Sequence, residues 1–169
     1  MRSAERLEGL AIAGAASVGA VRLEVPALLD SDGSAGPGVR LSGERADRPG
    51  RRRWILQSPE ARLELEARVA TPEISGTAES TELAAERCWF LHFPIEDSEW
   101  ERVRSSRPEL VVLSNARALF AQGEPFVTAV GAIRRQLGAA PLLWAPRVAL
   151  PNRLALLTYL GVDLLDLTE

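Results

Sequence analysis

Short apolar runs alternate with segments of helical periodicity across residues 88–167, and this alternation constrains the fold more than any other feature. The apolar runs, each of strand length, cover 88–93, 110–115, 142–145 and 162–167. Between them, the residue patterns predict helices over 97–104, 125–137 and 152–160. Continuously apolar strands joined by helices are typical of a parallel sheet that is covered on both faces. We therefore predict an α/β fold for this part of the chain.

The first part of the chain has a different character. Gly, Pro and Arg punctuate residues 31–53, which argues against a long helix there. Short β-type runs cover 39–41, 54–57 and 62–69. We predict a β-rich portion over residues 1–75, followed by strand–helix repeats over 77–169 that begin with a helix over 77–87.

Size and composition fit one soluble domain over residues 1–169. The chain has 169 residues, a net charge of −3 and 46% hydrophobic residues, which is ordinary for a folded protein. No run approaches the roughly 20 apolar residues that a membrane-spanning helix requires. We therefore expect a cytoplasmic protein without membrane contact.

The composition also excludes several kinds of chemistry. All 20 Lys+Arg residues are arginine, so a Schiff-base lysine and a phosphate-binding Walker lysine are absent. One cysteine, Cys88, and one histidine, His92, exclude a disulfide framework, a multi-cysteine zinc site and a histidine-based triad. We expect both residues to lie in the core and the protein to need no cofactor. Any catalysis must then rest on carboxylates.

Three polar residues follow or end the predicted strands. In a parallel sheet the binding groups gather where the strands end at their carboxyl termini, because those loops line a common edge. This rule selects Asn115, Arg147 and Asp166, an amide, a guanidinium and a carboxylate that could together bind a polar ring or a ribose. The structural alternative is that Asn115 caps a turn, Arg147 is solvated and Asp166 merely ends a strand.

A basic cluster lies in the Gly/Pro-rich segment and comprises Arg45, Arg48, Arg51, Arg52 and Arg53. Arginines in such a loop suit phosphate contacts. With a net charge of −3 there is no broad attractive field, so any contact with a nucleic acid would be local. A solvated loop is the alternative.

Several stretches carry a family resemblance. They are 141–146 (PLLWAP), 151–166 (PNRLALLTYLGVDLLD), 108–116 (PELVVLSNA) and 21–29 (VRLEVPALL). Together they resemble the tRNA-guanine transglycosylase superfamily, most of all the transglycosylase-like domain of archaeosine synthase. The resemblance implies a TIM barrel that exchanges a guanine in tRNA for a 7-deazaguanine base. It also implies that Asp166 is the nucleophile, with Arg51, Arg52 and Arg53 available to hold tRNA phosphates.

The chain departs from the family in three respects. It lacks a convincing Asp-Ser-Gly-Gly-Phe-Gln stretch for the substrate base, and it lacks the family's zinc-site cysteines. It is also shorter than the roughly 250 residues of a closed barrel. We therefore predict a partial barrel over residues 88–167, with tRNA as its partner. An open edge at 162–167 would favour self-association or a partner chain that completes the barrel. A non-catalytic interaction domain and an unrelated small α/β enzyme are the alternatives.

Overall fold

The computed structural model describes residues 88–166 with their side chains and, before them, the backbone of eight strands. These strands are β1 (Ser3–Arg6), β2 (Ile12–Val18), β3 (Val21–Val25), β4 (Ala27–Leu29), β5 (Arg40–Arg45), β6 (Arg51–Gln57), β7 (Arg62–Arg68) and β8 (Thr81–Leu83). Strands β1–β3 pair in one antiparallel sheet and β5–β7 in another. Strands β4 and β8 belong to a third sheet, which also contains the later strands.

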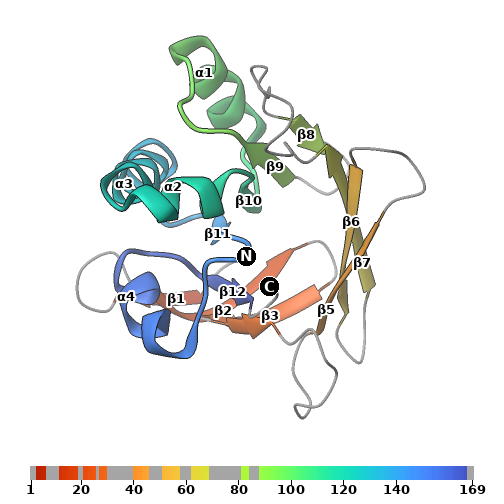
Figure 1. Ribbon diagram of the computed structural model, residues 1–169. Helices are drawn as coiled ribbons and strands as arrows, with labels where there is room; N and C mark the ends of the chain where they lie inside the picture. The colour runs from red at the N-terminus through yellow and green to blue at the C-terminus, as the bar shows by residue number, and fades with distance from the viewer. Residues whose placement is uncertain are drawn as a thin grey trace.

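Strands and helices alternate through the rest of the described chain (Figure 1). The elements are β9 (Cys88–Leu91), α1 (Asp97–Ser106), β10 (Leu110–Leu113), α2 (Ala116–Gln122), α3 (Glu124–Leu137), β11 (Leu142–Trp144), the 3-10 helix η2 (Pro151–Arg153), α4 (Leu154–Tyr159) and β12 (Leu164–Asp166). Strands β9, β10, β11 and β12 are consecutive parallel neighbours. The predicted α/β fold with a parallel sheet is therefore confirmed for this region.

The third sheet has six strands in the order β4-β12-β11-β10-β9-β8. Strand β4 pairs parallel to β12, and β8 pairs antiparallel to β9. The predicted helix over 77–87 is therefore wrong at Thr81–Leu83. Backbone pairing with the edge of β9 outweighs the local helical preference of this segment, which is a non-local effect that a sequence window cannot register.

The expectation of an open edge at 162–167 is also wrong. Strand β4 pairs with β12 through Leu164, Leu165 and Asp166. Leu164 and Leu165 are buried rather than exposed. An unpaired apolar strand was the physical reason for expecting self-association or a barrel-completing partner chain, and this reason no longer holds. Residues 167–169 lie outside the described part of the chain.

Local signals account for the two longer helices. Helix α1 has Asp97 and Glu99 in its first turn and Arg104 in its last turn, an order that complements the helix dipole. Helix α3 has a proline in its first turn and ends at Gly138, whose φ of 68° is open to glycine. Gly123, with a φ of 76°, separates α3 from the short helix α2. The sequence pattern did not predict helix α2.

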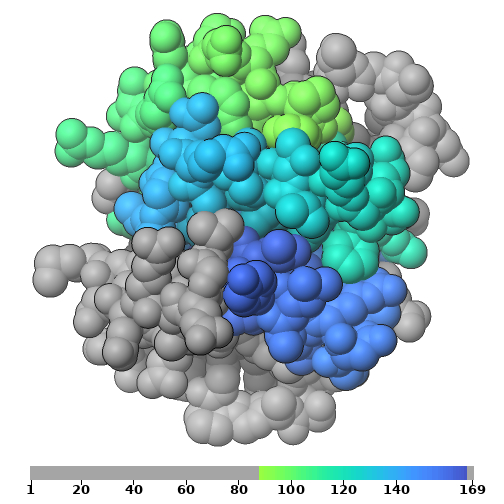
Figure 2. Space-filling model, turned by 90° about the vertical axis from the view of Figure 1, so that its left-hand side faces the viewer, coloured from red at the N-terminus to blue at the C-terminus, as the bar shows by residue number. Residues whose placement is uncertain are grey.

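Successive side chains of each strand point to opposite faces of the sheet, and the four helices pack on one of them. That face belongs to the main core cluster, which includes Trp89, Val111, Leu143 and Leu165 together with buried residues of α1–α4. Figure 2 shows this helical layer from outside. The opposite face, here called the second face, presents Cys88, Phe90, Leu110, Val112, Leu142, Trp144, Leu164 and Asp166.

All eight side chains of the second face are buried, although the helices of the described region pack on the other side (Figure 1). Burial on both faces explains why the strands are continuously apolar, because a strand with two buried faces cannot alternate polar and apolar residues. Asp166 is the exception, a carboxylate among apolar neighbours at the end of β12.

Candidate functional site

Asp166 ends β12 on the second face, and its relative exposure is 0%. Both of its carboxylate oxygens accept hydrogen bonds. The indole Nε1–H of Trp144 donates to Oδ2 at 2.7 Å, and the backbone N–H of Arg147 donates to Oδ1 at 2.9 Å. The carboxylate therefore joins β12 to the end of β11 and to the turn that follows β11.

Strand register brings these groups together. Trp144 lies opposite Leu164 across the parallel pair, and Asp166 lies two residues beyond Leu164 on the same face. After β11 the chain turns, and Arg147 has a φ of 63°. Such a left-handed conformation is uncommon for a residue other than glycine and carries a conformational cost. In this turn the backbone N–H of Arg147 meets the carboxylate.

The backbone of Arg147 thus makes the hydrogen bond to Asp166. Its side chain is half-buried as a whole, and the Nε of its guanidinium is buried. The predicted role of this guanidinium in binding a substrate stays a prediction. The sequence correctly predicted that Arg147 and Asp166 lie at the same edge of the sheet.

Asn115 lies at the same carboxyl edge, just after β10, which is two strands away from β12. Its side-chain amide binds both backbone groups of Phe93. Nδ2 donates to the Phe93 carbonyl at 2.6 Å, and Oδ1 accepts from the Phe93 N–H at 3.2 Å. Asn115 therefore fastens the segment that follows β9, which is a structural task, and its predicted part in substrate binding stays a prediction.

His92 follows β9 in that same segment and is half-buried, so the expectation of a core histidine is wrong. Its Nδ1 lies 3.4 Å from Ser114 Oγ, and its Nε2 lies 3.4 Å from Asn115 Nδ2. Ser114 Oγ in turn donates to the Leu91 carbonyl at 2.9 Å. Burial lowers the pKa of His92, and the charge of Glu99 opposes this effect in part.

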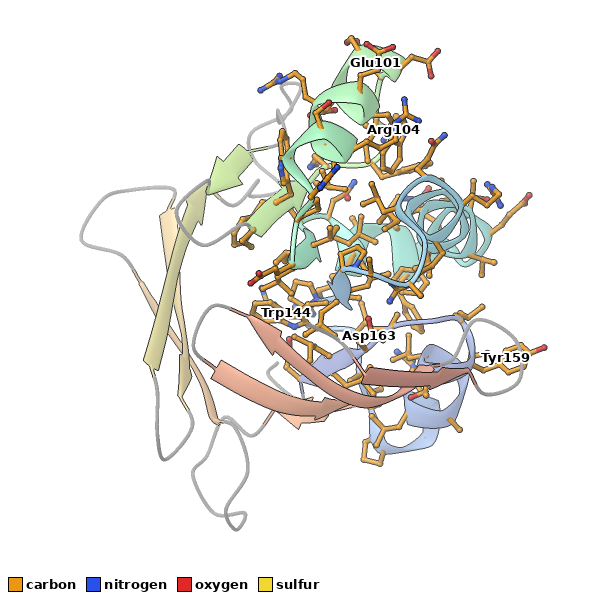
Figure 3. The ribbon with its side chains drawn as sticks, turned by 180° about the vertical axis from the view of Figure 1, so that it is seen from behind. Glu101, Arg104, Trp144, Tyr159 and Asp163 are labelled. Atoms are coloured by element: carbon orange, nitrogen blue, oxygen red, sulfur yellow. The ribbon has the colours of Figure 1, made fainter. Side chains whose placement is uncertain are left out.

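A second polar network lies where β12 begins, and the sequence reading missed it. Arg134 of α3 and Asp163 form a buried ion pair. Arg134 also donates to the carbonyls of Gly161 and Pro141, at 3.0 and 2.9 Å. The backbone N–H of Leu143 donates to Asp163 Oδ2 at 2.8 Å. In Figure 3, Asp163 lies in the interior, whereas Tyr159 points away from the molecule.

One sequence signal could have found this network. Arg134 lies four residues after Val130, so it falls on the apolar stripe of α3, where an arginine must be paired when it is buried. Its partner Asp163 could not be identified in the same way, because the two residues are far apart in the sequence.

The predicted phosphate-binding arginines Arg51, Arg52 and Arg53 belong to β6. Their side chains lie outside the described residues, so their relation to Asp166 stays a prediction. Within residues 88–166, no three His, Cys, Asp or Glu side chains are grouped in a way that could hold a metal ion. The helices of the described region are too short or too polar for any of them to cross a membrane.

Comparison with known proteins adds no relative: no protein-family model, curated protein or solved structure matches this chain. The candidate site therefore rests on its own geometry. That geometry is a carboxylate at the carboxyl edge of a parallel sheet, held by two N–H donors and directed to the face opposite the helices. A carboxylate held in this way can act as a nucleophile toward a sugar carbon or as an anchor for the neighbouring turn.

Proposed function

We propose that this protein modifies tRNA by transglycosylation, exchanging a guanine for a 7-deazaguanine base, with Asp166 as the nucleophile. The single observation that carries the proposal is the position of Asp166. This carboxylate ends the parallel strand β12 on the face of the sheet opposite the helices. Catalytic groups of α/β barrels come from this edge of the sheet. The Gly161–Asp166 stretch also belongs to the part of the sequence that resembles the transglycosylases.

Two features of the sheet support the barrel-like fold that this proposal requires. Strand β4, from the early stretch that resembles the family, pairs parallel to β12, which carries the candidate nucleophile. In an α/β barrel, too, a strand from early in the chain lies parallel beside the last one, although the sheet described here ends at β4 and at the antiparallel β8. In addition, the second face is buried although α1–α4 pack on the other face, as expected for a sheet that curves around its own interior.

The proposed reaction needs a carboxylate and no redox partner. An oxygen of Asp166 attacks C1′ of the ribose, and the bond from C1′ to the guanine nitrogen breaks. The departing guanine gains a proton at that nitrogen. The incoming 7-deazaguanine loses a proton from the matching nitrogen and attacks C1′, which releases the Asp166 carboxylate. Because Asp166 is buried, tRNA binding must open its cover.

The proposal also sets the partners. Transfer RNA is the macromolecular substrate, and the cell compartment is the cytoplasm. Arg51, Arg52 and Arg53 would contact phosphates of the tRNA backbone, so binding should weaken as the salt concentration rises.

One observation favours a second candidate function. Asp166 is buried and both of its oxygens already accept hydrogen bonds, so it could serve purely as a structural link between β11 and β12. The protein would then be a non-catalytic interaction domain that retains the fold.

Incorporation of radiolabelled guanine into tRNA tests the proposal. The wild-type protein should incorporate label, and Asp166→Asn, which keeps the shape but removes the charge, should not. Asp97→Asn is the matched control, because Asp97 is an exposed acidic residue in the first turn of α1. Equal incorporation by wild type and Asp166→Asn would exclude Asp166 as nucleophile. Absence of incorporation in all three proteins, with tRNA binding retained, would favour the interaction domain.

A further inference from the structure

We propose that Trp144 is a positioning residue for Asp166, which holds the carboxylate in the orientation needed for attack; this inference rests on the proposed transglycosylase function. The indole N–H of Trp144 donates to Asp166 Oδ2 at 2.7 Å, a short distance for an N–H donor. Hydrogen bonds to an ionised acceptor are shorter and stronger than those between neutral groups.

The bond is built on rigid elements. Trp144 ends β11, Asp166 ends β12, and the two strands pair directly through Trp144 and Leu164. The indole is fully buried on the second face, so its ring cannot turn away without disturbing the packing around it. The N–H is therefore fixed relative to the backbone that carries the carboxylate.

The two donors bind different oxygens of the Asp166 carboxylate. Trp144 takes Oδ2, and the backbone N–H of Arg147 takes Oδ1. Loss of the indole N–H would remove the bond that holds Oδ2, while the Arg147 contact on Oδ1 would stay. Because the Arg147 donor belongs to the backbone, a side-chain substitution cannot remove it. Trp144 is thus the residue at which the orientation of Asp166 can be changed.

Trp89 provides an internal control for this inference. It is also a buried tryptophan of the same sheet, but it lies on the face that packs against the helices. Its indole N–H donates to the hydroxyl of Ser106 at 2.6 Å. Trp89→Phe and Trp144→Phe therefore each remove one indole N–H donor from a buried ring. Of the two substitutions, Trp144→Phe is the one that removes the bond to Asp166.

We expect a characteristic kinetic change. Trp144→Phe should lower kcat for guanine exchange by about 10- to 100-fold, which corresponds to the loss of one hydrogen bond to a charged group. KM for tRNA should change little, because the indole N–H acts on Asp166, whereas the proposed tRNA contacts are made by Arg51, Arg52 and Arg53. Trp89→Phe should leave kcat within about threefold of the wild type.

The first measurement does not depend on activity. The chain has four tryptophans, and their indole N–H signals can be assigned by NMR with single Phe substitutions. Asp166→Asn should move the signal of Trp144 and leave that of Trp89 in place. An unchanged Trp144 signal would show that the bond does not form in solution and would overturn the proposal.

The second measurement is guanine exchange by wild type, Trp144→Phe and Trp89→Phe, with folding checked by circular dichroism. If Trp144→Phe does not fold, 3-benzothienylalanine at position 144 replaces it, because this analogue keeps the tryptophan shape and has sulfur in place of the N–H. Wild-type kcat in folded Trp144→Phe, or in the folded analogue at position 144, would overturn the positioning role while the transglycosylase function stood. Absence of exchange by the wild type would overturn the proposed function, and this inference with it.

Discussion

Two buried aspartates, Asp163 and Asp166, mark the two ends of β12 and have different surroundings. Asp163, before the strand, contacts the guanidinium of Arg134 and the backbone N–H of Leu143. Asp166, at the end of the strand, contacts the indole of Trp144 and the backbone N–H of Arg147. Among the contacts of the described residues, Asp163 is thus paired with a buried cation, and Asp166 accepts from two neutral N–H donors.

The difference shows how a parallel sheet can separate stability from chemistry. A buried ion pair whose cation also binds backbone carbonyls holds α3 against the beginning of β12. A carboxylate held by N–H donors at the carboxyl edge lies where parallel sheets bind their ligands. We therefore infer a structural role for Asp163, and the chemical role of Asp166 stays a proposal that substitutions of the two residues can test.

The largest effect is expected from Asp163→Asn. This change leaves the buried Arg134 guanidinium without its carboxylate, and removal of one partner of a buried ion pair costs about 3–5 kcal/mol. Urea unfolding should show a loss of this size. The double variant Arg134→Met/Asp163→Asn should recover part of it, because the uncompensated cation is then gone. If Asp163→Asn destabilised the protein no more than Asp166→Asn, the structural role of Asp163 would be wrong.

Asp166→Asn should have a smaller effect on stability and a complete effect on exchange. The asparagine can accept one of the two hydrogen bonds, while its NH2 group faces the other donor, so we expect a loss of about 1–3 kcal/mol. Urea unfolding and guanine incorporation, measured on the same preparation, check both parts. A loss of stability as large as that of Asp163→Asn would favour the purely structural reading of Asp166.

Arg147→Gly separates the backbone of Arg147 from its side chain. Glycine suits the φ of 63° and keeps the N–H that donates to Asp166, so stability should change by no more than about 1 kcal/mol. Guanine exchange should fall if the guanidinium binds substrate, as the sequence predicts. Unchanged exchange in the folded variant would remove Arg147 from the list of substrate-binding residues.

The smallest effect concerns pH and the segment that follows β9. Burial lowers the pKa of His92 below 6.5, so the folded state binds its proton less readily than the unfolded chain does. The contribution of His92 to the free energy of unfolding is thus present above pH 6.5 and is lost as the pH falls below this value. His92→Gln should flatten this part of the pH profile of unfolding, because His92 is the one histidine in the chain. A profile that the substitution leaves unchanged would contradict this assignment.

The sequence predicted those parts of the fold that local physics controls. Helix α3 follows from its apolar stripe, its proline start and Gly138, and the strands follow from continuous apolar runs. The segment Thr81–Leu83 was assigned to a helix because its pairing with β9 is not a local property. Helix α2 was missed because it is short and lies directly before Gly123.

The same limit applies to the site. The position of Asp166 at the carboxyl edge followed from the strand pattern. Its partner Trp144 did not, because their contact depends on the register of β11 against β12. Arg134 and Asp163 likewise meet only after α3 has packed on the sheet. A sequence can thus name a site residue at a strand end while leaving open which side chains hold it.

The pairing of β4 with β12 has a consequence for the time at which this protein acquires its site. Asp166 lies opposite Leu29, so the strand that carries the candidate nucleophile finds one of its neighbours in the early part of the chain. Contacts between residues so distant in sequence form late, because the loop between them must first be closed at an entropic cost. On a ribosome β4 must wait until β12 has been synthesised. The pairing that flanks Asp166 on this side therefore forms only after the segment between Leu29 and Leu164 has been synthesised.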